Sequence, residues 1–156
     1  MPSGAAEAAA RFGVGHVDHV DDPALAEFLP DPVVAAAHAY CRQASPGTVL
    51  MTQTFDARLV APRLAARNGA GVVMNAVDVE ARNEGIAVTA TAYGGDTRVE
   101  YDVAGTAVVG VVADPLLPEP AASPSSPEVR SVAVDLGGVS ERVRVVEKAV
   151  AEGPRL

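Results

Sequence analysis

Apolar residues repeat along this chain in two patterns, one typical of helices and the other typical of strands. Apolar positions three or four residues apart predict helices, and short runs rich in valine predict strands. The predicted helices cover residues 5–12, 32–43 and 59–68, and the predicted strands cover 15–20, 48–52, 71–79, 86–93, 98–103, 106–112, 129–136 and 143–150. Helices and strands alternate first and strands follow one another later, so the pattern predicts an α/β fold.

The order of these elements also predicts the layers of the fold. We expect a mostly parallel open sheet with the Rossmann-type layering of nucleotide-binding folds and right-handed crossovers. The later strands either extend this sheet in antiparallel pairs or form a small adjoining sheet, with turns at 80–85 and 94–96. Residues 1–113 form the main domain, 114–128 form a linker rich in proline and serine, and 129–156 add strands that complete the same domain.

Composition and net charge limit the kinds of binding partner and the cellular compartment that we expect for this protein. The chain has 156 residues and a formal net charge of -8, which argues against nucleic acid as a partner because phosphate contacts need a basic face. The single cysteine, Cys41, excludes an internal disulfide and fits a reducing compartment. The sequence has no apolar run long enough to span a membrane and no secretory leader pattern at its start, so we expect a cytoplasmic protein.

The loop after the second predicted strand is the strongest local candidate for a ligand site. In an open α/β sheet, ligands usually bind where loops leave the carboxyl ends of the strands. Thr54 and Asp56 can cap the following helix, or the same loop can receive an anion on its backbone N–H groups with Arg58 assisting. Both interpretations of Thr54, Asp56 and Arg58 remain open at this stage.

The histidines and the cysteine invite a metal or catalytic interpretation that their spacing does not favour. His16 and His19 are three residues apart on a predicted strand, so they point to opposite faces. His38 and Cys41 are three apart on a predicted helix, but no second cysteine completes a zinc motif, and no basic neighbour is expected to activate the thiol. We therefore predict no metal site and no catalytic set.

Two arginines on the third predicted helix form a candidate partner surface. Arg63 and Arg67 are four residues apart and share one face of that helix. This face can pair with acidic groups of a partner subunit, or it can be an ordinary solvated face.

Several motifs in succession resemble one family. The stretch VLMTQTFDARLVAPRLAARNGAGVVMNAVDVE, which contains the APRLAARNG helix motif at 61–69, resembles the amino-terminal domain of electron transfer flavoprotein alpha subunits. Residues 20–28 resemble the segment after that family's third strand, and 93–95 followed by 106–109 resembles its tyrosine-glycine turn and next strand. The resemblance covers roughly residues 5–112 and continues more loosely to the end.

The resemblance implies a role as well as a fold. Family members pass electrons from dehydrogenases with FAD as the cofactor, and their alpha subunit pairs with a beta subunit. No residue here inherits a flavin contact by motif, because the motifs of the family's FAD-binding domain are absent from this sequence. The chain is therefore expected to dock a beta-like subunit and to position a flavin domain that is separate or lost, without catalysis and without binding FAD alone.

The same resemblance predicts an incomplete sheet. Family members usually open with a strand, a helix and a second strand that become central in the sheet, whereas this chain begins near its first helix. We expect the sheet to be left incomplete, to be completed by another chain, or to fold differently. Two further functions stay open: a small adenine-nucleotide-binding module that uses the Thr54–Arg58 loop, and a gene remnant without independent activity.

Overall fold

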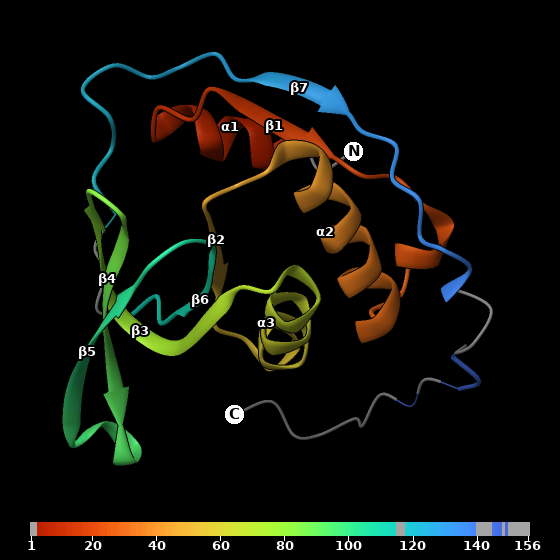
Figure 1. Ribbon diagram of the computed structural model, residues 1–156. Helices are drawn as coiled ribbons and strands as arrows, with labels where there is room; N and C mark the ends of the chain where they lie inside the picture. The colour runs from red at the N-terminus through yellow and green to blue at the C-terminus, as the bar shows by residue number, and fades with distance from the viewer. Residues whose placement is uncertain (1–2, 115–117, 140–144, 148, 150–156) are drawn as a thin grey trace.

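The computed structural model describes residues 3–114, 118–139, 145–147 and 149 (Figure 1). Its α-helices are α1 (Ser3–Arg11), α2 (Pro30–Ala44) and α3 (Phe55–Asn68), and short 3₁₀ turns cover Pro23–Leu25 and Tyr93–Gly95. Its strands are β1 (His16–His19), β2 (Thr48–Thr52), β3 (Gly71–Arg82), β4 (Gly85–Ala92), β5 (Thr97–Val103), β6 (Ala107–Val111) and β7 (Glu128–Ser131). The predicted alternation of helices and strands is therefore confirmed.

The main sheet contains five strands in the order β2-β6-β3-β4-β5. Strands β2, β6 and β3 are parallel to one another, whereas β4 and β5 add an antiparallel extension to β3. This arrangement confirms an α/β fold with a partly parallel sheet and additional antiparallel strands. The sequence could not show that β6 lies between β2 and β3, because that order depends on pairing between distant segments.

The hydrophobic core lies on both faces of this sheet. On one face, α3 packs its buried residues Ala61, Leu64 and Ala65 against Val108 of β6. On the other face, the antiparallel strands contribute most of a second cluster. Its buried members are Val73, Ala76, Ile86, Val88, Ala90, Ala107 and Val109. Alanine and valine dominate both clusters, as expected for a chain without tryptophan, because small side chains let a helix and a sheet approach closely.

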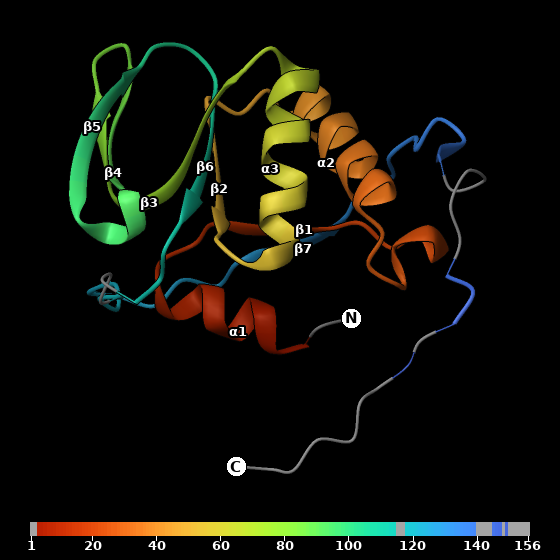
Figure 2. The same ribbon diagram turned by 90° about the horizontal axis from the view of Figure 1, so that it is seen from below.

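The first and last described strands form a separate small sheet. Strands β1 and β7 pair in parallel, with His16 opposite Glu128 and His19 opposite Ser131. Figure 2 shows this pair running across the end of β2, beside α2 and above α1. β1 precedes α2 and β2 in the chain, yet it is not a strand of the main sheet.

The structure corrects two predicted boundaries and describes only part of a third predicted element. The turn predicted at 80–85 is wrong over its first half, because β3 continues to Arg82 and pairs there with Gly85. Gly85 has φ +113°, and a Cβ there would lie 2.1 Å from the Val103 carbonyl oxygen, so the close approach of β5 requires glycine. In the C-terminal part, only 129–131 of the predicted strand 129–136 is strand, within β7, and half of the predicted strand 143–150 falls outside the described residues, while its described residues 145–147 and 149 are not strand.

Candidate functional site

The carboxyl ends of the parallel strands β2, β6 and β3 meet at one edge of the main sheet. The loop after β2 starts at this edge and leads directly into α3. Thr54 is the N-cap of α3, and its Oγ1 accepts a hydrogen bond of 3.1 Å from the Ala57 N–H. The structure thus shows the capping role of Thr54, which satisfies one of the free N–H groups at the helix start.

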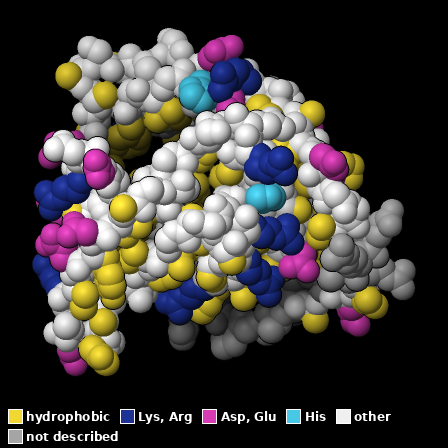
Figure 3. Space-filling model, in the orientation of Figure 1, with side chains coloured by type: hydrophobic (Ala, Val, Ile, Leu, Met, Phe, Trp, Pro, Cys, Tyr) yellow, Lys and Arg dark blue, Asp and Glu magenta, His cyan; other side chains and the backbone are white. Residues whose placement is uncertain are grey.

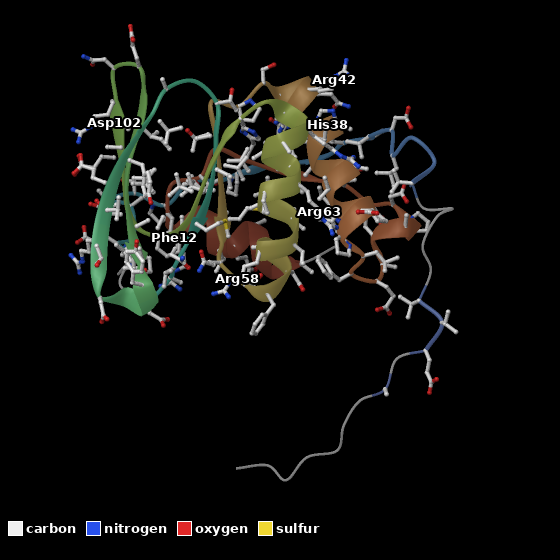
Figure 4. All side chains as sticks on the ribbon, turned by 60° about the horizontal axis from the view of Figure 1, so that its bottom comes forward. Phe12, His38, Arg42, Arg58, Arg63 and Asp102 are labelled. Carbon is white, nitrogen blue, oxygen red and sulfur yellow. The ribbon has the colours of Figure 1, made fainter. Side chains whose placement is uncertain are left out.

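The other two loop residues lie in the first turns of α3. Asp56 and Arg58 are both exposed, and the Arg58 guanidinium lies 6.0 Å from the centroid of the Phe55 ring. Phe55 itself is 86% exposed, so this contact is a surface one. Figure 4 shows Arg58 directed outward at the start of α3. The structure therefore brings Thr54, Asp56 and Arg58 into one exposed helix start, and none of them lines the cavities of about 310 to 640 Å³ that lie elsewhere on the described residues.

A pair of amide side chains lies beside this loop, and the sequence analysis did not identify it. The Gln53 side-chain amide donates to Asn75 Oδ1, and Gln53 Oε1 accepts from the Asn75 backbone N–H. Asn75 has φ +59° and occupies an irregularity where the β3–β6 register shifts. A Cβ on Gly110 would lie 3.2 Å from Gln53 Oε1, so the neighbouring strand leaves room for this amide. A polar residue inside the apolar run VVMNAV was the signal that could have indicated it.

The predicted partner surface divides into two environments. Arg63 pairs with Asp31 of α2 across 3.1 Å, and both side chains are about half exposed. Arg67 instead lines a cleft together with His38 and Arg42. The two arginines share a face of α3. Helix α2 supplies the carboxylate of Asp31 to Arg63, whereas it places a second arginine, Arg42, near Arg67.

A dense polar cluster joins β1, α2 and β7. Arg130 donates from Nε to Asp18 Oδ1 at 2.6 Å and through a second nitrogen to Oδ2 at 2.8 Å, and Tyr40 Oη donates to Oδ2 at 2.6 Å. These hydrogen bonds from Arg130 and Tyr40 lower the pKa of Asp18 to about 2, and the same carboxylate raises the pKa of Tyr40. We call Asp18, Tyr40 and Arg130 the Asp18 tie, because it fastens β7 and α2 to β1.

The histidines and the cysteine lie in separate places. His16 Nε2 is 3.8 Å from Asp18 Oδ2, whereas the ring of His38 is hydrogen-bonded to Asn68. Cys41 is partly buried against the cluster between α3 and β6. Among the described residues, no group of three or more histidine, cysteine, aspartate or glutamate side chains is arranged to hold a metal ion. In the same part of the chain, no helix has the length and hydrophobicity needed to cross a membrane.

Comparison with known proteins places this geometry in a family. Residues 2–136 match the family model described as electron transfer flavoprotein domain. The chain is 33% identical over 148 residues to the electron transfer flavoprotein subunit alpha of Mycobacterium tuberculosis (strain CDC 1551 / Oshkosh), a match that covers 94% of this chain and 39% of the relative. It is 30% identical over 103 residues to the subunit alpha of Syntrophomonas wolfei, covering 66% of this chain and 32% of that protein.

A third relative gives the same result at an intermediate coverage. The subunit alpha of Mycobacterium leprae is 33% identical over 114 residues, which is 72% of this chain and 33% of the relative. The chain thus spans less than two fifths of the length of these relatives. The family match covers most of the described residues, including α3 with its APRLAARNG motif and the whole main sheet. The chain belongs to the electron transfer flavoprotein domain family and is similar to its alpha subunits.

Proposed function

We propose that this protein acts as an electron transfer flavoprotein alpha-like scaffold that docks a beta-like subunit. In this role it is a cytoplasmic, non-catalytic component of a heterodimer or larger assembly that passes electrons from dehydrogenases. FAD belongs to the assembly and is held by a separate flavin-binding domain, because the chemistry of electron transfer is the cofactor's and no flavin motif is present in this sequence. The similarity to alpha subunits supports the proposal.

The open edge of β2 is the observation that carries the docking role. Among the described residues, β2 pairs only with β6. The Gly47 carbonyl accepts from the Ala107 N–H and the Gln53 N–H donates to the Val111 carbonyl. Because backbone groups alternate in direction along a strand, those of Thr48, Leu50 and Thr52 point away from β6. An uncharged edge of this kind is available for pairing with another polypeptide.

The side chains at this edge support the same conclusion. Leu50 lies opposite Val109, which is fully buried, yet Leu50 is 58% exposed because no described element covers the edge of β2 on that face. An apolar groove of about 410 Å³ lies between α2 and the segment from β1 to Leu25. Val20, Leu25, Val33 and Ala36 line this groove. A beta-like subunit seated on the β2 edge would remove Leu50 from water, which favours association.

Co-expression with an electron transfer flavoprotein beta subunit from the same genome tests the proposal. We expect the chain to purify with the beta subunit as one species, measured by size-exclusion chromatography with light scattering, and the chain alone to be colourless. Leu50→Glu is expected to weaken the complex at least tenfold, since it places a charge on the docking edge. Leu59→Glu is the matched control, because Leu59 is 45% exposed on α3, away from the β2 edge.

Three outcomes would contradict parts of this proposal. Failure to form any complex with the beta subunit would remove the docking role and favour the alternative of a gene remnant. A complex that tolerates Leu50→Glu and loses affinity with Leu59→Glu would move the interface from β2 to α3, where Arg63 and Arg67 form the predicted partner surface. Binding of AMP to the chain alone, lost in Thr54→Ala, would favour the adenine-nucleotide module.

A further inference from the structure

A basic cleft lies between the C-terminal ends of α2 and α3, at the end of the helices opposite to Thr54. Arg42 is in the last turn of α2 and Arg67 is in the last turn of α3. Two adjoining cavities, of about 610 and 310 Å³, are both lined by His38, Arg42 and Arg67. We call these three residues and the two cavities the arginine cleft. Figure 3 shows the Lys or Arg and His side chains gathered over α2 and α3, and Figure 4 shows His38 and Arg42 adjacent on α2.

The charge of the cleft is opposite to that of the chain as a whole. The protein carries a formal net charge of -8, yet neither Arg42 nor Arg67 forms an ion pair among the residues that the structure describes. Arg63, one helical turn before Arg67, is paired with Asp31, and Arg130 is paired with Asp18. Two guanidinium groups that share a cleft repel each other, and an anion between them removes that cost.

His38 offers a third polar contact to a ligand in the cleft. Its Nδ1 lies 2.5 Å from Asn68 Oδ1. An amide oxygen only accepts hydrogen bonds, so Nδ1 carries the proton and the ring is fixed by the end of α3. The second ring nitrogen is then left for a ligand, as an acceptor in neutral histidine and as a donor in the protonated form. Ser45 and Thr106 also line the smaller cavity and add hydroxyl groups at its edge.

The two cavities share the three cationic or ring side chains but differ in their other lining residues, and this difference suggests the kind of ligand. The smaller one adds Ser45, Asn68 and Thr106, whereas the larger one adds the apolar side chains of Ala35, Ala39, Leu136 and Val139 beside Gln43 and Asp135. A phosphate group carries about -1.5 to -2 charges at pH 7 and has three terminal oxygens, so it can accept from both guanidinium groups at once. A molecule with a phosphate at one end and a compact apolar body would fill both cavities.

We propose that the arginine cleft binds the phosphate group of a small phosphate monoester, with Arg42 and Arg67 as its main contacts and His38 as a third. The body of the ligand lies along Ala39, Leu136 and Val139. Asp135 also lines the larger cavity, and its Oδ1 accepts from the Gly137 N–H, so this carboxylate limits how far negative charge can extend toward the glycine turn. The site is independent of the proposed docking function, since it uses neither the β2 edge nor the apolar groove.

The alternative explanation is that both arginines only stabilise the helix ends. Cationic side chains in the last turn interact favourably with the helix dipole, and both helices end in a left-handed residue, Ser45 and Gly69. That explanation predicts a loss of stability when either arginine is removed. It predicts no binding of phosphate that depends on both of them, and this difference separates the two explanations.

Isothermal titration of the purified chain with inorganic phosphate and with 1-naphthyl phosphate tests the proposal. We expect 1-naphthyl phosphate to bind with submillimolar affinity and to bind more tightly than inorganic phosphate, because its ring occupies the apolar part of the cleft. Arg42→Gln and Arg67→Gln should each weaken binding about tenfold or more, and Asp135→Asn should strengthen it. Arg98→Gln, an exposed arginine on β5, is the matched control and should leave binding unchanged.

The results that would overturn the proposal are equally specific. Absence of binding of either compound up to several millimolar would leave the arginines with the helix-end role alone. Equal losses in Arg98→Gln and Arg67→Gln would indicate non-specific attraction to any surface cation. Equal binding of 1-naphthyl phosphate and 1-naphthoate would show that a carboxylate suffices and that the site does not select phosphate. Circular dichroism of each variant verifies that the helices remain folded.

Discussion

The α3 side of the molecule and the β1–β7 side are held together by different kinds of interaction. On the α3 side, Leu64 and Val108 are completely buried, and the contacts are apolar and non-directional. On the β1–β7 side, neither strand contributes a residue to the two core clusters, and polar bonds make the attachment. A region built on apolar burial tolerates small shifts, whereas a region built on a few directed hydrogen bonds depends on each of them.

Besides the bond of 3.2 Å from the Gln43 side-chain amide of α2 to the Ala133 carbonyl, two groups of hydrogen bonds fasten the β1–β7 side. The first is the Asp18 tie, in which Arg130 reaches back to a residue 112 positions earlier. The second joins the 118–127 segment to the end of α1, where the Ala121 N–H donates to the Arg11 carbonyl and the Ser125 hydroxyl donates to the Val14 carbonyl at 2.7 Å. Because polar bonds, and not the apolar core, hold the β1–β7 sheet in place, we expect the main sheet to remain folded when the β1–β7 sheet detaches.

The largest effect should come from removing apolar volume on the α3 side. Leu64→Ala is expected to lower the free energy of unfolding by about 2–5 kcal/mol, since it removes a fully buried side chain and leaves a cavity between α3 and β6. Leu59→Ala, on the same helix but 45% exposed, should change it by less than about 0.5 kcal/mol. Urea denaturation followed by circular dichroism measures both. Similar losses in the two variants would mean that α3 is not the apolar anchor of the sheet.

A smaller effect on the same side should come from the helix start. Thr54→Ala removes the oxygen that accepts from the Ala57 N–H, and about 1 kcal/mol of stability should be lost. Thr54→Ser keeps a hydroxyl at the same position and should retain most of the stability. If Thr54→Ala had no effect while ligand binding changed, the residue would serve the ligand-loop function instead of the cap.

The comparison also explains what could be predicted from the sequence. The helix motif of α3 and the valine-rich strands produce strong local patterns, so their type and approximate extent follow from hydrophobic periodicity. The position of β6 between β2 and β3, and the β1–β7 pair, arise from contacts between residues far apart in the chain. No local pattern carries that information, and 4-residue strands give little periodicity to recognise.

The candidate sites also divide into those that a local sequence pattern indicates and those that form from residues far apart in the chain. Thr54 and Asp56 are both cap candidates from their place before an apolar helix, because the preference for such residues at a helix start is a local rule. The Asp18 tie and the arginine cleft were missed because each combines residues from different elements that become neighbours only after folding. Arg67 was identified, but its neighbour Arg42 belongs to another helix and could not be paired with it by spacing alone.

The smallest global effect, and the most local one, should come from breaking the Asp18 tie. Asp18→Asn removes the charge that holds Arg130 and should leave the urea midpoint of the main sheet nearly unchanged. Amide hydrogen exchange should nevertheless become faster in the paired strands β1 and β7, because their attachment is weakened. Tyr40→Phe is the milder matched variant, since it removes one hydrogen bond of 2.6 Å and keeps the ion pair. Faster exchange across β3 and β4 as well would show that the two regions unfold as one unit.

Lowering the pH tests the role of the Asp18 tie without any substitution. The folded-state pKa of Asp18 is about 2, below its ordinary value of 3.8, so the tie stabilises the folded protein above pH 4 and that contribution is lost as the pH falls toward 2. Exchange in β1 and β7 should therefore rise between pH 4 and pH 2 relative to exchange in β3, after correction for the intrinsic pH dependence of exchange. In Asp18→Asn the ratio of the exchange rate in β1 and β7 to the exchange rate in β3 should already be high at pH 5 and should not change as the pH is lowered. A ratio that rises equally in both proteins would assign the acid response to other carboxylates and would show that the tie does not control the attachment of the small sheet.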